Sequence, residues 1–433
     1  MTTDVDVSTA DATFEAQLNP DSLSALMRST WTWDDRALRR DLSDLLVAVT
    51  AARARRQSAG PDDAIGATLH YRALSSGAAF AASVLGPALI ADTGNALRSQ
   101  FVSAASDPAQ FNRRTHVHFA DVLEGVGDYF TNHLRALEYA PESQWRSLVY
   151  EDGRAGLSMT LRACGNQLSD SPWFANMALV WQTLEAAGTP SAASHASAVR
   201  EGQLSATLAA AEASGSWDPA LVRTKATRVA DEWRLTGTKF FVPAAGDAEK
   251  VYVIARSLAG PTLFAVDGRH PTLTVSAQET IDSTRPLYAL TFTDTPAELI
   301  GIEGAGGRLM SEALDLVVTA LAAEQVGLIE SALAILRTQL ASSTDAPWWA
   351  GEAVLRHAAA ESLWRQALAD NTPESAAAAH IGCSAAAVWI GTLVAQLCPD
   401  SQSTVILRRA LSGSLWFGGP ALSHERLLER LGI

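Results

Sequence analysis

Few residues in this sequence have the spacing of a known catalytic or metal-binding motif. His116 and His118 could bind a metal ion from one side of a strand, but no third ligand stands at a suitable spacing. Cys164, Cys383 and Cys398 are far apart and form no Cys-x-x-Cys pair. The sequence has no serine-hydrolase elbow, P-loop or dinucleotide-binding glycine pattern. We therefore predict no metal site, and any chemistry must come from a site without these short motifs.

Composition narrows the classes of partner and the compartment. The formal net charge is −14 and the pI about 5.1, so the surface repels nucleic-acid phosphates and we predict no nucleic-acid role. The sparse cysteines and the polar N-terminus without a secretory signal favour the cytoplasm. Residues 73–91 carry no charge, but they are rich in alanine, serine and glycine, which is too weakly apolar for a membrane span.

Hydrophobic periodicity divides the chain into three segments. Residues 1–205 have a helical pattern, and Asp34 and Asp35 could cap a helix whose apolar residues recur at intervals of three and four. The N-terminal residues 1–20 are expected to be disordered. From 206 to 302, short β-branched runs alternate with turn residues, which predicts a middle antiparallel β domain. Gly237 is expected to form the turn of a hairpin there. Residues 303–433 return to a helical pattern, so we predict an α+β fold that ends in a C-terminal helical bundle.

Several runs carry a family resemblance, which covers residues 175–433. The segments 211–218 (AEASGSWD), 224–228 (TKATR) and 233–243 (WRLTGTKFFVP) resemble the β domain of acyl-CoA dehydrogenases. Among these enzymes they are most similar to bacterial forms that include heteromeric steroid-degrading enzymes. Further similarity lies in 280–285 (TIDSTR), in 322–327 (AAEQVG) and in the ending around 417–427. The resemblance implies a cleft for flavin and an acyl thioester, walled by the β domain and the C-terminal helices.

The chemistry of this family needs a carboxylate to remove the α-proton while flavin accepts the β-hydride. The resemblance places that base either in the loop 415–420 or on the helix directly after Leu314-Asp315-Leu316. Here the loop holds no carboxylate, and Val317 and Val318 follow Leu316. Asp315 and Glu324 are the nearby candidates for a replacement base. A surface role for Asp315 and a structural role for Glu324 remain the alternatives.

The flavin-binding residues that the resemblance implies are also incomplete. Phe240, Phe241 and Val242 occupy the run that lies against the flavin ring in the family, and Gln396 is what remains of a Gln-x-x-Gly-Gly-x-Gly motif. The Arg-x-x-Phe-Gly motif for the pyrophosphate is missing from residues 336–349. We therefore expect FAD to be bound weakly or not at all. Arg285 is expected to contact a CoA phosphate or a partner subunit, with a structural salt bridge as the alternative.

These inferences leave three hypotheses about function, and they leave open whether the chain is an enzyme. In the first, the chain is a partner subunit of a flavin-linked acyl-thioester dehydrogenase, in a homo- or hetero-oligomer with another acyl-CoA dehydrogenase-like chain. In the second, it is a repurposed non-redox biosynthetic enzyme that acts on a CoA or carrier-protein thioester. In the third, it is a divergent FAD-dependent oxidoreductase. The fold alone does not distinguish them.

Overall fold

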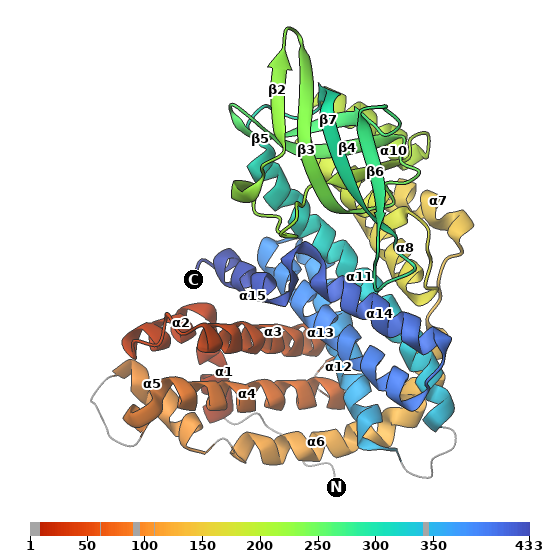
Figure 1. The fold of residues 1–433 in the computed structure, drawn as a ribbon. Coiled ribbons are helices and arrows are strands. Elements are labelled where there is room, and N and C mark those ends of the chain that lie inside the picture. The colour runs from red at the N-terminus through yellow and green to blue at the C-terminus, as the bar shows by residue number, and fades with distance from the viewer. Residues whose placement is uncertain (1–8, 61, 90–95, 108, 341–345) are drawn as a thin grey trace. The chain divides into compact units, whose positions relative to one another are not determined.

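The computed structural model describes residues 9–60, 62–89, 96–107, 109–340 and 346–433. The chain forms two compact units, each built from separate segments of sequence. Unit 1 comprises Met1–Ala136, Arg337–Ala386 and Ala421–Ile433, and unit 2 comprises Leu137–Leu336 and Ala387–Pro420. The predicted fold class is confirmed, because helices precede and follow a sheet in the middle of the chain (Figure 1). Three domains divided at 205 and 302 stay a prediction, since each compact unit draws on several segments.

Unit 1 is helical. Asp35 caps α3 by accepting hydrogen bonds from the backbone N–H groups of Ala37 and Leu38, at 2.8 and 3.1 Å, as the sequence predicts. Helix α4 packs between α3 and α6 (Figure 1). The elements that lie wholly in this unit are α1 (Thr9–Gln17), α2 (Pro20–Ser29), α3 (Arg36–Ala59), α4 (Ala64–Leu85), η1 (Gly86–Leu89), α5 (Ala96–Ser106), α6 (Ala109–Asp128), η2 (Tyr129–His133), η3 (Leu134–Ala136) and α12 (Trp348–Asp370).

The prediction of disorder for residues 1–20 is wrong from residue 9 onward. Thr9–Gln17 forms α1, and the side chains of Phe14 and Leu18 are buried in the core of unit 1. Phe14 stacks on Phe111, with ring centroids 5.5 Å apart. Apolar burial therefore orders this segment despite its polar composition. Residues 1–8 lie outside the described part of the chain.

Unit 2 holds the strands and the helices that support them. Its helices are α7 (Glu142–Asp152), α8 (Arg154–Asn166), η4 (Phe174–Trp181), α9 (Gln182–Ala187), α10 (Pro190–Glu201), η5 (Pro219–Leu221), α14 (Ser401–Leu415) and η6 (Trp416–Gly418). Its strands are β1 (Ala206–Ala209), β2 (Lys225–Val229), β3 (Glu232–Pro243), β4 (Lys250–Ser257), β5 (Gly260–Asp267), β6 (Leu273–Gln278) and β7 (Leu287–Leu299). Three helices contribute to both units: α11 (Gly306–Leu340), α13 (Pro373–Leu397) and α15 (Gly419–Arg430).

The strand pairing closes the sheet on itself. Strand β4 pairs with β2, β2 with β3, β3 with β7, β7 with β5, and β5 with β4 again. The pairing is antiparallel except for β1 with β4 and the single pair Lys225 and Arg256 between β2 and β4. Alternate side chains fill the interior, where Val251, Phe264 and Leu290 are fully buried.

The predicted hairpin turn at Gly237 is wrong. Gly237 lies inside β3 at a shift in the register with β7, and the turn between β2 and β3 is at Ala230 instead. The backbone φ of Gly237 is +147°, a value that favours glycine. A Cβ at this position would lie 2.8 Å from the Cα of Thr224, so glycine permits a close approach that the local sequence pattern does not reveal.

Helices α8 and α11 cross closely through two glycines. A Cβ at Gly165 would lie 2.0 Å from the backbone oxygen of Glu324, and one at Gly327 would lie 1.9 Å from that of Arg162. Nearby, Glu330 of α11 forms a buried ion pair with Arg162 and accepts a 2.7 Å hydrogen bond from the Tyr139 hydroxyl. This crossing fixes the part of α11 that carries Glu324.

Two helices, α11 and α13, are long and apolar enough to cross a membrane by length and composition alone. In the most apolar windows of α11 and α13, 89% and 67% of the residues are buried inside the protein. Core helices of a packed protein pass the same test, so this is weak evidence for a membrane span.

Candidate functional site

Unit 2 contains an apolar cavity of about 470 Å³, which we call the aromatic cavity. Five of its lining side chains are aromatic: Trp217, Phe240, Phe241, Trp416 and Phe417. The other lining residues are Leu179, Leu208, Ala210, Ala211, Ser214, Gly215, Pro243, Gln278, Glu279, Thr280, Ile281, Leu287, Ser412, Leu415, Gly418 and Gly419. Its volume is in the usual range of small-molecule sites. The wall that the sequence predicted around Phe240 and Phe241 is thus part of a cavity.

A bulge in β3 brings Phe240 and Phe241 to this cavity. The register with β7 shifts between Lys239 and Val242, and Phe241 has a φ of +57°, which an ordinary strand residue avoids. The Phe240 N–H donates to the Ala211 oxygen at 3.1 Å, and the Phe241 N–H donates to Gln278 Oε1 at 2.9 Å. Val242, the third predicted residue, is instead buried in the core of the sheet.

The loop that carries Trp217 is anchored by a buried lysine. Lys239 Nζ donates to Glu212 Oε1 at 3.0 Å and to the Ala210 oxygen at 2.9 Å. Burial lowers the pKa of Lys239 to about 8, although the neighbouring carboxylate opposes that shift. Glu212 also accepts the backbone N–H of Thr224 at 2.8 Å, so both ends of the loop are tied to one carboxylate.

The loop before α15 forms another part of the lining. Phe417 has a φ of +61°, and Gly418 and Gly419 follow with φ of +102° and +79°. The rings of Phe417 and Trp217 meet edge to face, with centroids 5.0 Å apart at 88°. The base position that the resemblance places in this loop therefore presents aromatic side chains to the cavity.

Glu279 is the only ionisable residue among the described residues that line the aromatic cavity. Glu279 directly follows Gln278, the last residue of β6, whose side chain accepts a hydrogen bond from the Phe241 N–H. Glu279 itself is exposed to solvent. No hydrogen bond or ion pair of Glu279 is found in the described part of the chain. Glu279 was not among the residues predicted from the sequence, because a single glutamate next to a motif has no spacing or pattern that marks it as functional.

Glu324 is fixed by two arginines beside the cavity wall. Arg285 Nη2 donates to both of its carboxylate oxygens, and Arg409 Nε donates to Oε1 at 2.8 Å. The side chain of Glu324 is only 3% exposed. Burial alone would raise the pKa of Glu324, but Arg285 and Arg409 hold it below its ordinary value. A carboxylate held in this way is a poor proton acceptor, and Glu324 does not line the aromatic cavity.

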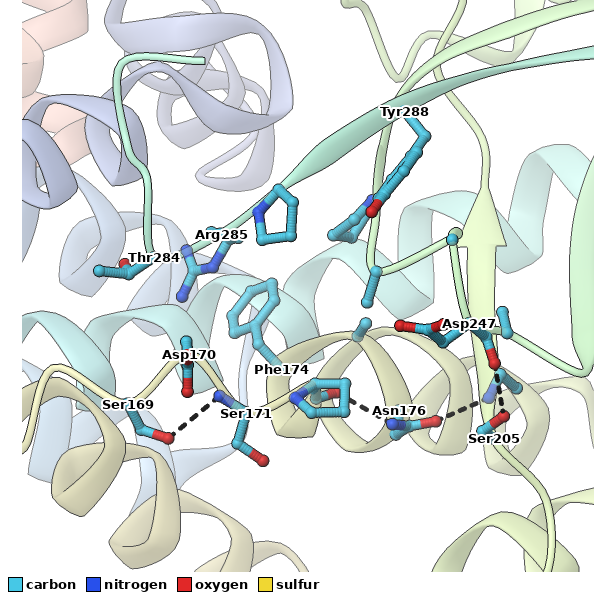
Figure 2. A pocket seen from close by; sticks show the side chains of 18 of the residues that line it. Ser169, Asp170, Ser171, Phe174, Asn176, Ser205, Asp247, Thr284, Arg285 and Tyr288 are labelled. Atoms are coloured by element: carbon cyan, nitrogen blue, oxygen red, sulfur yellow. Dashed lines mark hydrogen bonds between the residues drawn. The ribbon is translucent and has the colours of Figure 1, made fainter. Parts of the chain in front are cut away.

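Arg285 also borders a second, smaller cavity of about 160 Å³, which we call the Arg285 cavity. Figure 2 shows Arg285 and Thr284 on one side of it and Asp247 and Ser205 on the other. Several polar groups of the lining bond to one another; Asn176 Oδ1, for example, accepts the backbone N–H of Ala206 at 2.7 Å. Arg285 Nη1 is buried and has no hydrogen-bond partner among the described residues.

Two aromatic rings that meet edge to face lie against the Arg285 guanidinium. Its Cζ lies 4.6 Å from the ring centroid of Phe174 and 4.7 Å from that of Trp416. Trp416 lines the aromatic cavity and Arg285 lines the other, so the two cavities are neighbours within unit 2. This places the predicted substrate-binding residue beside the aromatic cavity and in an internal salt bridge at the same time.

The structure does not bring the remaining predicted residues to either cavity. Asp315 is half-buried on α11, and Val317 and Val318, at the alternative base position, are buried in the core. Gln396 is exposed near the end of α13. Residues 341–345, in the segment that lacks the pyrophosphate motif, lie outside the described part of the chain. His116 and His118 are on helix α6 rather than a strand, and the described residues contain no group of three or more possible metal ligands.

The residues around the aromatic cavity do not fit a complete FAD. Its described lining contains no arginine, lysine or histidine to offset a pyrophosphate, and its one charged group is negative. The backbone N–H groups of Phe240 and Phe241 already donate within the protein, to the Ala211 oxygen and Gln278 Oε1. The cavity thus suits a flat, apolar group without the phosphates of a dinucleotide.

Helices before and after a middle sheet are also the arrangement of solved acyl-CoA dehydrogenases. One similar structure is butyryl-CoA dehydrogenase from Megasphaera elsdenii, with a TM-score of 0.61, 17% identity, and coverage of 73% of this chain and 98% of that chain.

Two further structures share this fold. The Tcur3481-Tcur3483 steroid acyl-CoA dehydrogenase, in a variant form, has a TM-score of 0.53 and 22% identity, covering 73% of this chain and 98% of that chain. PigA with FAD and proline has a TM-score of 0.60 and 18% identity, covering 72% of this chain and 97% of that chain. No protein-family model matches the sequence. The resemblance stated from the sequence is confirmed at the level of the fold.

Proposed function

We propose that this chain is a partner subunit of a flavin-linked acyl-thioester dehydrogenase, one that binds the thioester but does not supply the base. One observation carries the proposal: aromatic side chains, not a carboxylate, line the cavity at the loop where the resemblance expects the base. The alternative position on α11 holds buried valines, and the candidate Glu324 is committed to Arg285 and Arg409.

In this proposal the two cavities divide the ligand between them. The aromatic cavity excludes water and holds the apolar part of the acyl group. Arg285 borders the adjacent cavity, and its buried Nη1 has no hydrogen-bond partner among the described residues, so we assign this donor to a thioester carbonyl or a CoA phosphate. The proton removal and the hydride transfer are assigned to the complete partner chain, since the residues here do not fit FAD.

A comparison supports this pairing. The steroid acyl-CoA dehydrogenase among the similar structures has a name made of two parts, Tcur3481 and Tcur3483. It shares 22% sequence identity with this chain. By analogy, the chain would act in a hetero-oligomer with another acyl-CoA dehydrogenase-like chain in the cytoplasm. Such an analogy concerns the fold and leaves the site to be tested.

One observation favours a second candidate, a non-redox enzyme that acts on a CoA or carrier-protein thioester. Glu279 is a carboxylate at the aromatic cavity, it has no partner among the residues that the structure describes, and it could exchange a proton with a bound acyl group. Elimination or cyclisation would need such a group and no flavin.

Co-expression with a complete acyl-CoA dehydrogenase from the same gene neighbourhood tests the proposal. We expect a stable complex that reduces a dye acceptor in the presence of an acyl-CoA, and no activity from this chain alone. Phe417→Ala should weaken acyl-CoA binding by the complex, whereas Leu258→Ala, at a fully exposed turn, should not. Stoichiometric flavin and dye reduction by the single chain would establish a divergent FAD-dependent oxidoreductase instead. Conversion of a thioester without a change in oxidation state would establish the second candidate.

A further inference from the structure

The lining of the aromatic cavity has an uneven charge. Five aromatic rings line the cavity, and the only ionisable group among its described residues is the carboxylate of Glu279. Aromatic faces attract cations, and recognition of organic ammonium groups commonly combines several such rings. A carboxylate at the solvent side adds to this attraction and repels an anion.

No positive charge on the described part of the lining offsets this preference. The guanidinium of Arg285 lies on the ring of Trp416, but it is paired with Glu324 and does not line the cavity. Lys239 lies behind Ala210 and Glu212, to which its ammonium donates, and it does not line the cavity. The chain as a whole carries a net charge of −14, which favours the approach of cations further.

We propose that the aromatic cavity selects an apolar group that carries a protonated amine, with Glu279 as its counter-charge. This inference rests on the proposed function in one respect, that the group in the cavity is an acyl group. What it adds is that this acyl group carries a positive charge. Thioesters with an amine-bearing acyl group are the substrate class that this lining fits. Acyl groups that end in a second carboxylate are disfavoured.

Three probes of one shape separate charge from apolar burial: naphthylethylamine, neutral naphthylpropanamide and naphthylpropanoate. Calorimetric titration of the purified chain should give the tightest binding for the amine and the weakest for the carboxylate. Because Glu279 is exposed, we expect a difference of about twofold to tenfold, which added salt should reduce. Trp217→Ala should weaken the binding of all three probes, and that of the amine most, because the indole ring also attracts the cation.

Charge variants identify the responsible residue. Glu279→Gln should make the affinities for amine and carboxylate nearly equal, and Glu279→Lys should reverse their order. Glu303→Lys changes the net charge by the same amount at an exposed position outside the lining, so it should leave the order unchanged. Equal circular dichroism spectra and urea midpoints would show that each variant is folded.

Three results would overturn the inference: no binding of any probe to the wild-type chain, equal or tighter binding of the carboxylate, or an order that Glu279→Lys does not change. None of these measurements uses flavin, a thioester or a partner chain. The charge preference can therefore fail while the partner role survives, and the partner role can fail while the preference survives.

Discussion

Glu324→Gln tests whether this glutamate is a structural counter-charge or a base. The wild-type carboxylate is 3% exposed and neutralises Arg285 and Arg409, which are 8% and 4% exposed. Glutamine keeps the shape of the side chain and one acceptor oxygen but removes the negative charge. The buried guanidinium groups of Arg285 and Arg409 then lack the negative charge of Glu324. Breaking a buried pair in this way typically costs about 3–5 kcal/mol. We expect about 3 kcal/mol, because Asp282 also lies near Arg409 and offsets part of its charge.

Urea unfolding followed by tryptophan fluorescence measures this cost as a lower midpoint at an unchanged slope. Glu312→Gln is the matched control on the same helix, because Glu312 pairs with Arg308 at 2.7 Å but both side chains are about half exposed. It should cost less than about 1 kcal/mol. If Glu324→Gln costs no more than this control, Glu324 is not the buried counter-charge, and a catalytic role for it would return.

The pH dependence of the same comparison gives an independent check. The folded pKa of Glu324 is below its ordinary value of 4.5. Its contribution to stability is therefore complete above pH 4.5 and is lost as the pH falls through the folded pKa. The difference in unfolding free energy between wild type and Glu324→Gln should be constant from neutral pH down to about pH 4.5 and should become smaller below that pH. A gap that widens in acid would contradict the ion pair.

Two further predictions concern the helices. Gly327→Ala places a Cβ 1.9 Å from the backbone oxygen of Arg162, so we expect the free energy of unfolding, measured in urea, to fall by about 2 kcal/mol or more. Gly125 has open space around it, so Gly125→Ala is the control and should be neutral or slightly stabilising. Equal effects of the two substitutions would refute the close crossing. Burial lowers the pKa of His380 from 6.5 to about 4, so stability should fall by up to about 3 kcal/mol between pH 6.5 and 4 as the unfolded chain takes up a proton first. His380→Leu should flatten this slope and the exposed His116→Gln should not; an unchanged slope in His380→Leu would contradict the assignment.

Patterns local in sequence predicted the parts of the fold that depend on local physics. The cap at Asp35 and the β-branched strands are each encoded by neighbouring residues, and the structure has both. The resemblance assigned Phe240 and Phe241 to a ligand cleft; both line the aromatic cavity, and their role as ligand-binding residues stays a prediction.

Features that depend on distant residues were out of reach. Arg285 and Arg409 are 39 and 85 residues from Glu324, so nothing near it in the sequence reveals its pairing. Gly237 was assigned to a turn because the approach of Thr224, which makes glycine necessary inside the strand, is tertiary. Glu279 became a candidate only from the fold, in which it is the one ionisable residue of the described cavity lining.

The flavin content of the chain purified alone is the sharpest test of the proposed partner role. We expect a colourless protein with substoichiometric flavin, even after incubation with excess FAD, because the described lining of the aromatic cavity has no cation for a pyrophosphate and the N–H groups of Phe240 and Phe241 already donate within the protein. A stoichiometric flavin absorption band that an acyl-CoA bleaches, with no other chain present, would contradict it.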